Sequence, residues 1–362
     1  TLAALTPPDI DVRYLEIKDL RTEKWPPKDF DLVAISTFSA QVLDAYQVAD
    51  AYLDCGIPVV LGGLHVSSLP NEAQGHASSV VVGEGEMLWP QVVRDFQRGK
   101  LKPRYEQEPG HWFDFVESPI PRFDLLNIEK YNRLTVQTSR GCPHRCEFCA
   151  SSILLTPKYR VKPIENVLRE IRLIKELWRH PFIEFADDNS FVLRDHYKAL
   201  LRALVPERIR WFTETDISIA DDEELLELMR DSGCQQVLIG FESPTSLGMD
   251  GIEQNRNWKL KQLPRYEQAI ECIQSHGITV NGCFILGLDG HTPDIFDEVY
   301  RFVRRTRLYE VQITVQTAFP GTPLYARLKA DRRIIEDGRW DKCTLFDVNF
   351  VPTHMTPEEL QK

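Results

Sequence analysis

One stretch decides the fold and the chemistry: residues 134–149, which read LTVQTSRGCPHRCEFC. Its first six residues have the pattern of a short buried strand. Three cysteines follow in the spacing C-x3-C-x2-C, at Cys142, Cys146 and Cys149. The other cysteines are scattered singly: Cys55, Cys234, Cys272, Cys283 and Cys343. The chain opens without a signal-peptide pattern, so we expect the clustered thiols to bind metal rather than form disulfides.

Three thiolates in one short loop can hold three corners of a cubane iron–sulfur cluster. A cluster with four cysteine ligands is coordinatively closed and suits electron transfer. With three, one iron keeps an open position that the amine and carboxylate of a small ligand can chelate. Two alternatives stay open. One is structural zinc with His144 as the fourth ligand, although His144 lies cramped between two of the cysteines. The other is three buried structural cysteines.

Apolar runs alternate with amphipathic stretches, which predicts an α/β fold with parallel sheets. Near the amino terminus we expect strands at 12–18, 32–37, 59–63 and 79–83, with helices at 41–55 and 86–97. A second series has strands at 134–139, 182–187, 210–215, 236–242, 279–287 and 310–317. Its helices are expected at 164–179, 194–205, 221–232, 261–276 and 293–306, with Asp221 capping the third. Six strands with right-handed crossovers predict a partial (β/α)6 barrel, whose chemistry lies at the carboxyl ends of the strands.

These two series predict two domains. Residues 1–105 form a flavodoxin-like parallel-sheet domain, 106–130 a linker, 131–325 the barrel, and 326–362 a carboxyl-terminal extension that covers it. In such sheets the loops after the strands form the ligand crevice.

The cysteine motif, C-x3-C-x-Φ-C with Phe148 as the aromatic residue, resembles the radical S-adenosylmethionine (SAM) superfamily over residues 133–325. The resemblance implies a [4Fe–4S] cluster on Cys142, Cys146 and Cys149, and SAM bound to its open iron. It further implies reductive cleavage of SAM to methionine and a 5′-deoxyadenosyl radical, which abstracts a substrate hydrogen. Phe148 would lie near the adenine.

Strand ends supply further candidates for SAM contacts in that family. The second strand ends in Ala-Asp-Asp-Asn where relatives often carry Gly-Gly-Glu, so Asp187 and Asp188 are candidates for the methionine amine. Glu214 matches a position that binds ribose hydroxyls, and Glu242 is expected to face the same crevice. The alternative for each carboxylate is a solvated loop acid or a helix cap.

The stretch from residue 32 to 85 resembles the cobalamin-binding domain that precedes the barrel in one radical SAM subgroup. In that fold a serine after one strand and a Gly-Gly after the next hold the nucleotide tail, and Ser36, Gly62 and Gly63 match them. The fold's first strand is expected to be missing before Thr1. His65 is interpreted as a loop residue rather than a cobalt ligand. The rival interpretation is a flavodoxin-like domain without corrinoid.

The amino-acid composition limits the kinds of molecule that this protein can be expected to bind. Lys and Arg total 43 and Asp and Glu 54, a formal net charge of −11, which disfavours nucleic-acid binding. No apolar run reaches the roughly 18–20 residues of a membrane span. We expect a cytoplasmic protein, a hydrophobic small-molecule substrate, and a low-potential electron donor such as flavodoxin or ferredoxin.

The subgroup includes hopanoid methylases, tetraether-lipid enzymes and the anaerobic magnesium-protoporphyrin cyclase. The leading hypothesis is therefore cobalamin-dependent C-methylation of a lipid, tetrapyrrole or other natural product. A corrinoid-free cyclisation, coupling or oxidation is the second hypothesis, and a non-catalytic iron–sulfur or SAM sensor the third. Cys343 is a candidate for quenching a substrate radical, although a lone cysteine is more often a small buried apolar residue.

Overall fold

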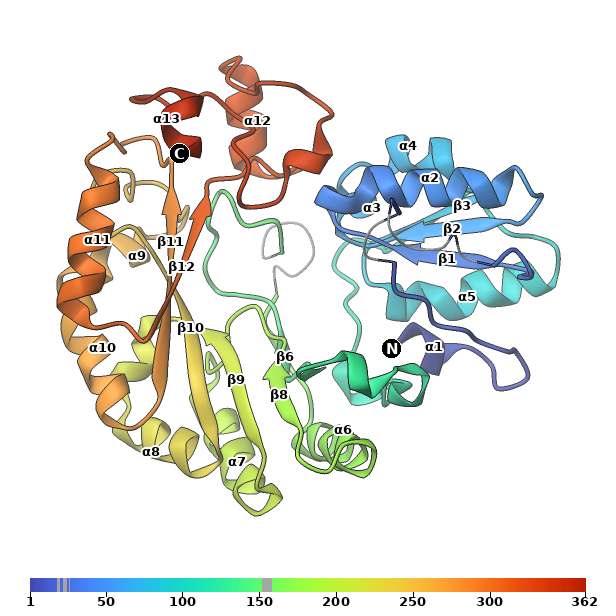
Figure 1. The fold of residues 1–362 in the computed structure, drawn as a ribbon. Helices are drawn as coiled ribbons and strands as arrows, with labels where there is room; N and C mark the ends of the chain where they lie inside the picture. The colour runs from blue at the N-terminus through green and yellow to red at the C-terminus, as the bar shows by residue number, and fades with distance from the viewer. Residues whose placement is uncertain (18–19, 22–24, 26, 152–157) are drawn as a thin grey trace.

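The computed structural model describes residues 1–17, 20–21, 25, 27–151 and 158–362. Two separate parallel sheets dominate it, one near the amino terminus and one larger and curved (Figure 1). This confirms the predicted α/β class, while the domain limits given above stay predictions.

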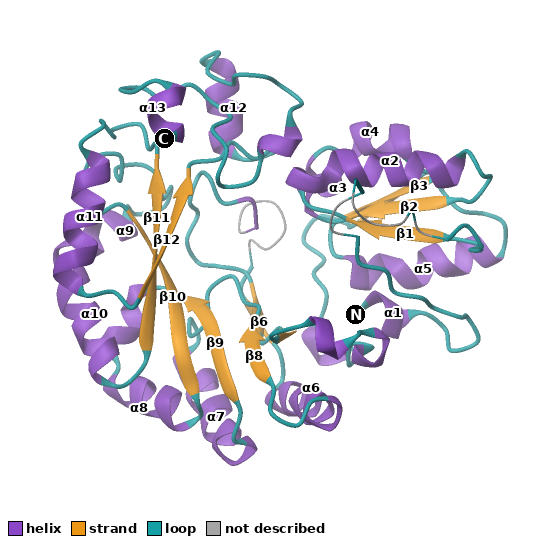
Figure 2. Ribbon diagram, viewed as in Figure 1, coloured by secondary structure: helices purple, strands orange, loops and turns teal. Residues whose placement is uncertain are grey.

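The amino-terminal sheet has four parallel strands in the order β1-β2-β3-β4: Val33–Ser36, Val59–Gly62, Ser79–Val82 and Arg104–Glu106. Helices cover both faces, with α2 (Val42–Leu53), α3 (Leu64–Ser68) and α4 (Pro70–Ala73) on one and α5 (Gly85–Gln97) on the other (Figure 2). Successive residues of β2 point to opposite faces, so Val59 and Leu61 join one apolar core and Val60 the other. Burial on both faces explains the continuous apolar runs in the sequence.

The second sheet has six parallel strands in sequential order, β12-β11-β10-β9-β8-β5. They span Leu134–Val136 (β5), Phe182–Phe185 (β8), Arg210–Thr215 (β9), Cys234–Glu242 (β10), Thr279–Leu286 (β11) and Glu310–Val315 (β12). Helices lie outside the curve: α6 (Ile164–Leu177), α7 (Arg194–Leu204), α8 (Glu223–Asp231), α10 (Tyr266–Ser275) and α11 (Ile295–Thr306) (Figure 1). The short helix α9 (Trp258–Gln262) lies at the carboxyl end of β10, where Lys259 contacts Gly240 and Glu242. The predicted partial (β/α)6 barrel is confirmed.

Alternation along β9 shows how the barrel positions functional groups. Trp211 and Thr213 are buried toward the helices, where Trp211 stacks on Phe185 with ring centroids 4.7 Å apart. Glu214 is on the opposite, concave face. The large apolar residues thus build the outer core, and the inner face is left for polar groups.

Short elements complete the chain. Strands β6 (Ser139–Arg140) and β7 (Arg160–Val161) form an antiparallel pair. Helix α1 (Leu2–Leu5) precedes the first sheet, and α12 (Pro323–Ala330) and α13 (Pro357–Gln361) follow the barrel. Turns of 3-10 helix span Ser39–Gln41, Gln74–His76, Phe115–Glu117, Phe123–Leu125, Ile128–Lys130, Val205–Glu207, Ile217–Asp221, Leu263–Arg265 and Trp340–Lys342. Trp340 and Cys343 of the carboxyl-terminal extension pack into the core of the amino-terminal domain.

Four expectations need correction. Residues 12–17 form no strand, and residue 18 lies outside the described part. Strand β4 was not expected at all. The helix expected at 261–276 is broken by a 3-10 turn at Leu263–Arg265, because Pro264 lacks the amide hydrogen that a continuous helix needs. The cap of α8 is Asp222, which accepts a hydrogen bond from the Leu225 amide, while Asp221 pairs with Arg265.

Within the described residues, no helix is both long enough and apolar enough to cross a membrane.

Candidate active site at the cluster-bearing loop

The three clustered cysteines lie in the loop that runs from β6 to β7. Cys146 is buried, and Cys142 and Cys149 are partly exposed. The Cys149 amide donates to the Cys146 carbonyl at 3.0 Å, which folds the loop back on itself. Burial raises the pKa of the Cys142 thiol to about 11 and that of Cys146 further still. Binding metal must therefore displace protons from these thiols.

Carboxylates at the end of β8 hold the start of this loop. Asp187 is buried and accepts hydrogen bonds from the Thr138 and Ser139 amides at 2.7 and 2.8 Å. Its second oxygen accepts from the hydroxyls of Thr138, Ser190 and Tyr197. Both oxygens are thus used within the protein. In the structure Asp187 shapes the entry to the loop. The sequence had suggested a different role for it, a contact with the SAM amine.

Asp188 ties the two sides of the loop together. One oxygen accepts from the Gly141 amide at 2.6 Å, directly before Cys142, and the other accepts from the Ser151 hydroxyl. This carboxylate therefore holds the cysteine segment at both ends.

The middle of the loop pairs with the segment after β10. Glu147 N donates to Ile252 O at 2.7 Å, and Gln254 N donates to Arg145 O at 2.9 Å, so Cys146 lies opposite Glu253 as in a strand pair. The far side of the loop is fixed by α12, where Arg327 forms an ion pair with Glu147 at 2.6 Å. Backbone pairing on one side and a charge pair on the other thus hold the backbone of the loop that carries the three cysteines.

The His144 side chain makes its contacts outside the group of three cysteines. Its ring stacks on Trp258 with centroids 4.4 Å apart, and its Nε2 lies 3.2 Å from Asp216. Asn189 donates to the same carboxylate at 2.9 Å and to the Cys142 sulfur at 3.8 Å. Burial alone would raise the pKa of Asp216, but hydrogen bonds from His144, Asn189 and Ser218 hold it well below its usual value. In the described part of the chain, no three His, Cys, Asp or Glu side chains converge to hold a single metal ion.

Glu242 ends β10 in a strained conformation. Its φ of 63° lies in the left-handed region, which costs an L-residue about 1–2 kcal/mol, and the strand is irregular at this point. The side chain is buried and forms an ion pair with Lys259, whose Nζ also donates to Gly240 O at 3.0 Å. Burial opposes the charge on Lys259, but Glu242 and the nearby Cys146 thiol raise its pKa above the usual value. A buried cation therefore stands beside the cysteines.

Replacing this cation should weaken the cluster's hold on an electron. In Lys259→Met we expect the midpoint potential of the reconstituted cluster to fall, because a positive charge near a cluster stabilises its reduced form. Melting temperature should also fall, since Glu242 is left buried and unpaired, at a cost of about 3–5 kcal/mol. Lys261→Met, two residues along and exposed, is the control. Equal midpoint potentials in the two variants would contradict the conclusion that the Lys259 ammonium lies close enough to the cluster to stabilise its reduced form.

Glu214 lies on the concave face, within electrostatic range of three other acids. Restricted solvation, followed by the charges of Glu184, Asp188 and Asp187, raises its pKa to about 7. Its side chain still reaches solvent. A carboxyl that is partly protonated near neutral pH can both donate and accept a hydrogen bond, as a vicinal diol requires.

This shift predicts a pH-dependent gain in stability for Glu214→Gln. The unfolded carboxyl ionises near pH 4.5 and the folded one near 7, so the wild type loses stability as the pH rises between these values. The amide cannot ionise. We expect the variant to melt like the wild type at pH 4.5 but to be more stable at pH 8, by about 1 kcal/mol after allowance for solvent screening. Differential scanning calorimetry at the two pH values checks this, and equal differences at both would refute it.

The three residues predicted to hold a corrinoid tail lie together at the carboxyl ends of β1 and β2. Ser36 is exposed at the end of β1, next to the end of β2 at Gly62. A Cβ on Gly62 would make only ordinary contacts, with Val81 at 3.8 Å, whereas one on Gly63 would lie 2.7 Å from the Thr37 carbonyl. Gly63 also has a φ of 102°. Local packing therefore requires glycine at 63, but not at 62.

His65 is part of α3 and is fully buried. Its Nδ1 lies 3.0 Å from the Ser39 hydroxyl and its Nε2 3.1 Å from Glu72. Burial lowers its pKa, so the ring stays neutral at pH 7. Trp340 of the carboxyl-terminal extension donates to the same Glu72. The ring thus has structural partners at both nitrogens.

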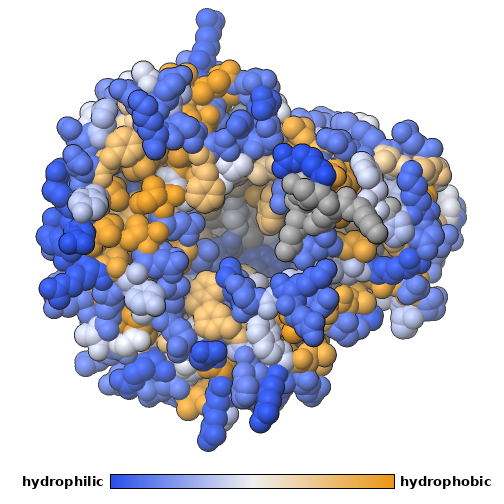
Figure 3. All heavy atoms as spheres, in the orientation of Figure 1, coloured by the Kyte–Doolittle hydropathy of each residue, from blue (hydrophilic) through white to orange (hydrophobic). Residues whose placement is uncertain are grey.

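Two candidate residues remain, Phe148 and Cys343. Phe148, directly before Cys149 in the chain, packs against the small apolar cluster of Met249, Ile252, Ile285 and Leu288. Cys343 is buried against the amino-terminal domain, and burial raises its pKa to about 12. A cavity of about 450 Å³ opens beside the cluster-bearing loop, lined by residues including Glu147, Ile252 and Gln316. Figure 3 shows the face of the molecule hollowed between the two domains.

Sequence reasoning missed Asn189, Asp216 and Lys259. Asn189 directly follows Asp188 and Asp216 lies two positions after Glu214, so strand-end position was a usable signal for both. Lys259 lies 17 positions after Glu242 on another element, and no spacing rule links them.

A curved barrel of six parallel strands, with a three-cysteine loop after its first strand, is the arrangement of a radical SAM enzyme. The family model described as the radical SAM superfamily matches residues 136–303. The chain belongs to this superfamily, which implies a [4Fe–4S] cluster and SAM as cofactors.

Similarity to individual proteins extends over nearly the whole chain. The chain is 30% identical to bacteriochlorophyllide d C-12(1)-methyltransferase of Chlorobaculum tepidum, over 99% of this chain and 78% of the relative. It is 28% identical to hopanoid C-2 methylase of Rhodopseudomonas palustris, over 93% of this chain and 64% of that protein, so less than two thirds of some relatives is spanned. The structure of the methyltransferase TsrM from Kitasatospora setae, with cobalamin and a [4Fe–4S] cluster bound, aligns with a TM-score of 0.65. That alignment has 18% identity over 84% of this chain and 68% of TsrM, and shows a shared fold.

Proposed function

We propose that this chain is a cobalamin-dependent radical SAM methyltransferase that methylates an unactivated carbon on a tetrapyrrole or a similarly hydrophobic molecule. The observation that carries the proposal is the 30% identity to a bacteriochlorophyllide methyltransferase over 99% of the chain. The match includes the residues of the amino-terminal sheet as well as those of the barrel.

The donor set suits the cofactors. Cys142, Cys146 and Cys149 supply three thiolates from one loop and leave one iron open, and Asn189 donates toward the first sulfur. When bound, the cluster supplies the electron that cleaves SAM to a 5′-deoxyadenosyl radical, and the corrinoid carries the methyl group.

Residues of this chain are placed to bind and orient SAM. Phe148, which is partly exposed, is the candidate contact for the adenine. Glu214, with its raised pKa, is the candidate partner of the ribose hydroxyls. Glu242 and Lys259 neutralise each other, so this buried pair adds no net charge next to the cysteines.

Corrinoid binding is the first test. We expect the full chain, reconstituted anaerobically with iron, sulfide and hydroxocobalamin, to retain about one corrinoid per chain through gel filtration. With methyl-labelled SAM, reductant and a chlorophyllide acceptor, label should appear in the acceptor, and 5′-deoxyadenosine should form alongside S-adenosylhomocysteine. Deoxyadenosine without methyl transfer or corrinoid would instead support a corrinoid-free radical reaction. No deoxyadenosine under strong reductant would favour a sensor.

Two neighbouring glycines give a matched pair of variants for the crevice. Gly62→Ala should keep the melting temperature, because its Cβ meets only Val81 at 3.8 Å, while reducing corrinoid affinity by about tenfold, or ~1.4 kcal/mol. Gly63→Ala should lower the melting temperature, because its Cβ would lie 2.7 Å from a carbonyl. Corrinoid affinity unchanged in Gly62→Ala would move the binding site away from this edge.

A further inference from the structure

A buried ionic network joins the two domains at the base of the cluster-bearing loop. The loop leaves the barrel at Arg140 and returns at Arg160, and these two residues pair directly across the antiparallel strands β6 and β7. This short stem (Ser139–Arg140 paired with Arg160–Val161) is where the loop that carries the three cysteines joins the barrel.

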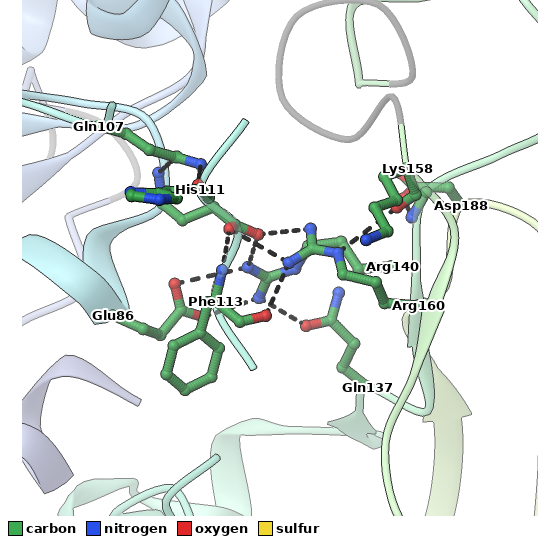
Figure 4. A network of polar contacts seen from close by, with 11 residues as sticks. Glu86, Gln107, His111, Phe113, Gln137, Arg140, Lys158, Arg160 and Asp188 are labelled. Carbon is green, nitrogen blue, oxygen red and sulfur yellow. Dashed lines mark hydrogen bonds and ion pairs between the residues drawn. The ribbon is translucent and has the colours of Figure 1, made fainter. Parts of the chain in front are cut away.

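The carboxylate that holds both arginines comes from the other domain. Glu84, in the loop between β3 and α5, has a side chain only 4% exposed. Its Oε1 accepts from Arg140 at 2.7 Å and from Arg160 at 2.6 Å. Its Oε2 accepts from Arg160 at 3.2 Å and from the Phe113 amide at 2.7 Å. Figure 4 shows the two arginines side by side, facing Glu86 and Phe113 across the junction.

Other groups complete the network without replacing Glu84. Glu86 pairs with Arg140 alone, at 2.7 Å. Both guanidinium groups also lie over the Phe115 ring, with Cζ of Arg140 4.9 Å and Cζ of Arg160 5.6 Å from the ring centroid. Of the carboxylates described at this junction, Glu84 is the one that contacts both cations.

The stem cannot hold this shape well by itself. Like charges directly opposite each other on paired strands destabilise the pairing, and burial strengthens the repulsion. Glu84 converts the repulsion into attraction through charge-assisted hydrogen bonds. It also stands at the carboxyl end of β3, the same edge of the sheet as Ser36 and Gly62.

We propose that Glu84 is a positioning residue that holds the stem of the cluster-bearing loop, so that the amino-terminal domain sets where the cluster stands relative to the crevice. The contacts at the stem stand on the structure alone. The role in positioning a cluster rests on the proposed function, in which Cys142, Cys146 and Cys149 are the cluster ligands.

Hydrogen exchange on the cluster-free full chain tests the stem directly. In Glu84→Gln, which keeps the side-chain shape, we expect amides of residues 138–141 and 160–162 to exchange on the order of tenfold faster. The double variant Glu84→Gln/Arg160→Gln should be slower than the single one, because the repulsion has been removed. The control is Glu207→Gln, which removes another largely buried carboxylate held by two cations, Arg172 and Lys175, within the barrel. Exchange unchanged in Glu84→Gln, or equally fast in the control, would overturn the proposal.

The reconstituted protein tests the consequence for the cluster. Glu84→Gln should bind iron but give an altered EPR spectrum of the reduced cluster, and the double variant should move back toward the wild-type spectrum. A wild-type spectrum in Glu84→Gln with a loosened stem would overturn the positioning role. Iron bound normally by Cys142→Ala would instead overturn the ligand set, and the exchange result for the stem would stand.

Discussion

Alanine at any one of Cys142, Cys146 and Cys149 should abolish reductive cleavage of SAM. We expect 5′-deoxyadenosine formation to fall by ~10³-fold or more, equivalent to at least about 4 kcal/mol of activation free energy. The physical reason is ligand count. With two thiolates left, the loop cannot hold three corners of a cubane, and solvent replaces the missing ligand.

The same variants should stay folded, because these thiols contribute little to the apolar core. The loop is held by Asp188, by the backbone pairing of Glu147 with Ile252, and by Arg327, none of which is a cysteine contact. Iron and sulfide content, the visible absorption of the cluster and HPLC of SAM products measure the effect.

Cys272→Ala provides the matched control. Cys272 is a partly exposed cysteine on α10 whose sulfur lies 3.7 Å from the Ala220 carbonyl. Its variant should keep the cluster and the rate. A cluster retained by Cys142→Ala, Cys146→Ala and Cys149→Ala alike would show that the metal binds elsewhere.

The sequence was most informative where function requires a local pattern. The spacing of the three cysteines needs nothing beyond eight consecutive residues, and the six barrel strands show up as short apolar runs. Strand order then followed from the handedness of crossovers, which the structure confirms as sequential.

Sequence was least informative where contacts join distant segments. Arg140 and Glu84 are 56 positions apart, and neither has a neighbour that signals the other. The strand expected at 12–18 failed for a related reason. Its apolar residues have the pattern of a strand, but a strand needs a partner, and residues 12–17 are paired with none.

Two substitutions of Asp187 distinguish a structural role from a contact with the cofactor, because they should differ sharply in their effect on stability. Asp187→Ala should destabilise the protein by about 3–5 kcal/mol, because it leaves two buried amides and three hydroxyl groups without their acceptor. At this chain length a loss of that size lowers the melting temperature by roughly 4–7 °C. The cluster-bearing loop should lose its fixed entry as well, since Thr138 and Ser139 lead directly into it.

Asp187→Asn should cost only about 1 kcal/mol. The amide oxygen can still accept from the Thr138 and Ser139 amides, while the new NH2 group faces Thr138, Ser190 and Tyr197, whose hydroxyls can rotate to accept. If Asp187 instead bound the SAM amine through its charge, the Asn variant would keep its stability and lose SAM affinity. Calorimetry and SAM titration of the two variants, beside Asp221→Ala as an exposed ion-pair control, distinguish these outcomes. We expect stability to follow the order wild type, Asn, Ala, with SAM affinity in the Asn variant within about threefold of wild type, ~0.7 kcal/mol.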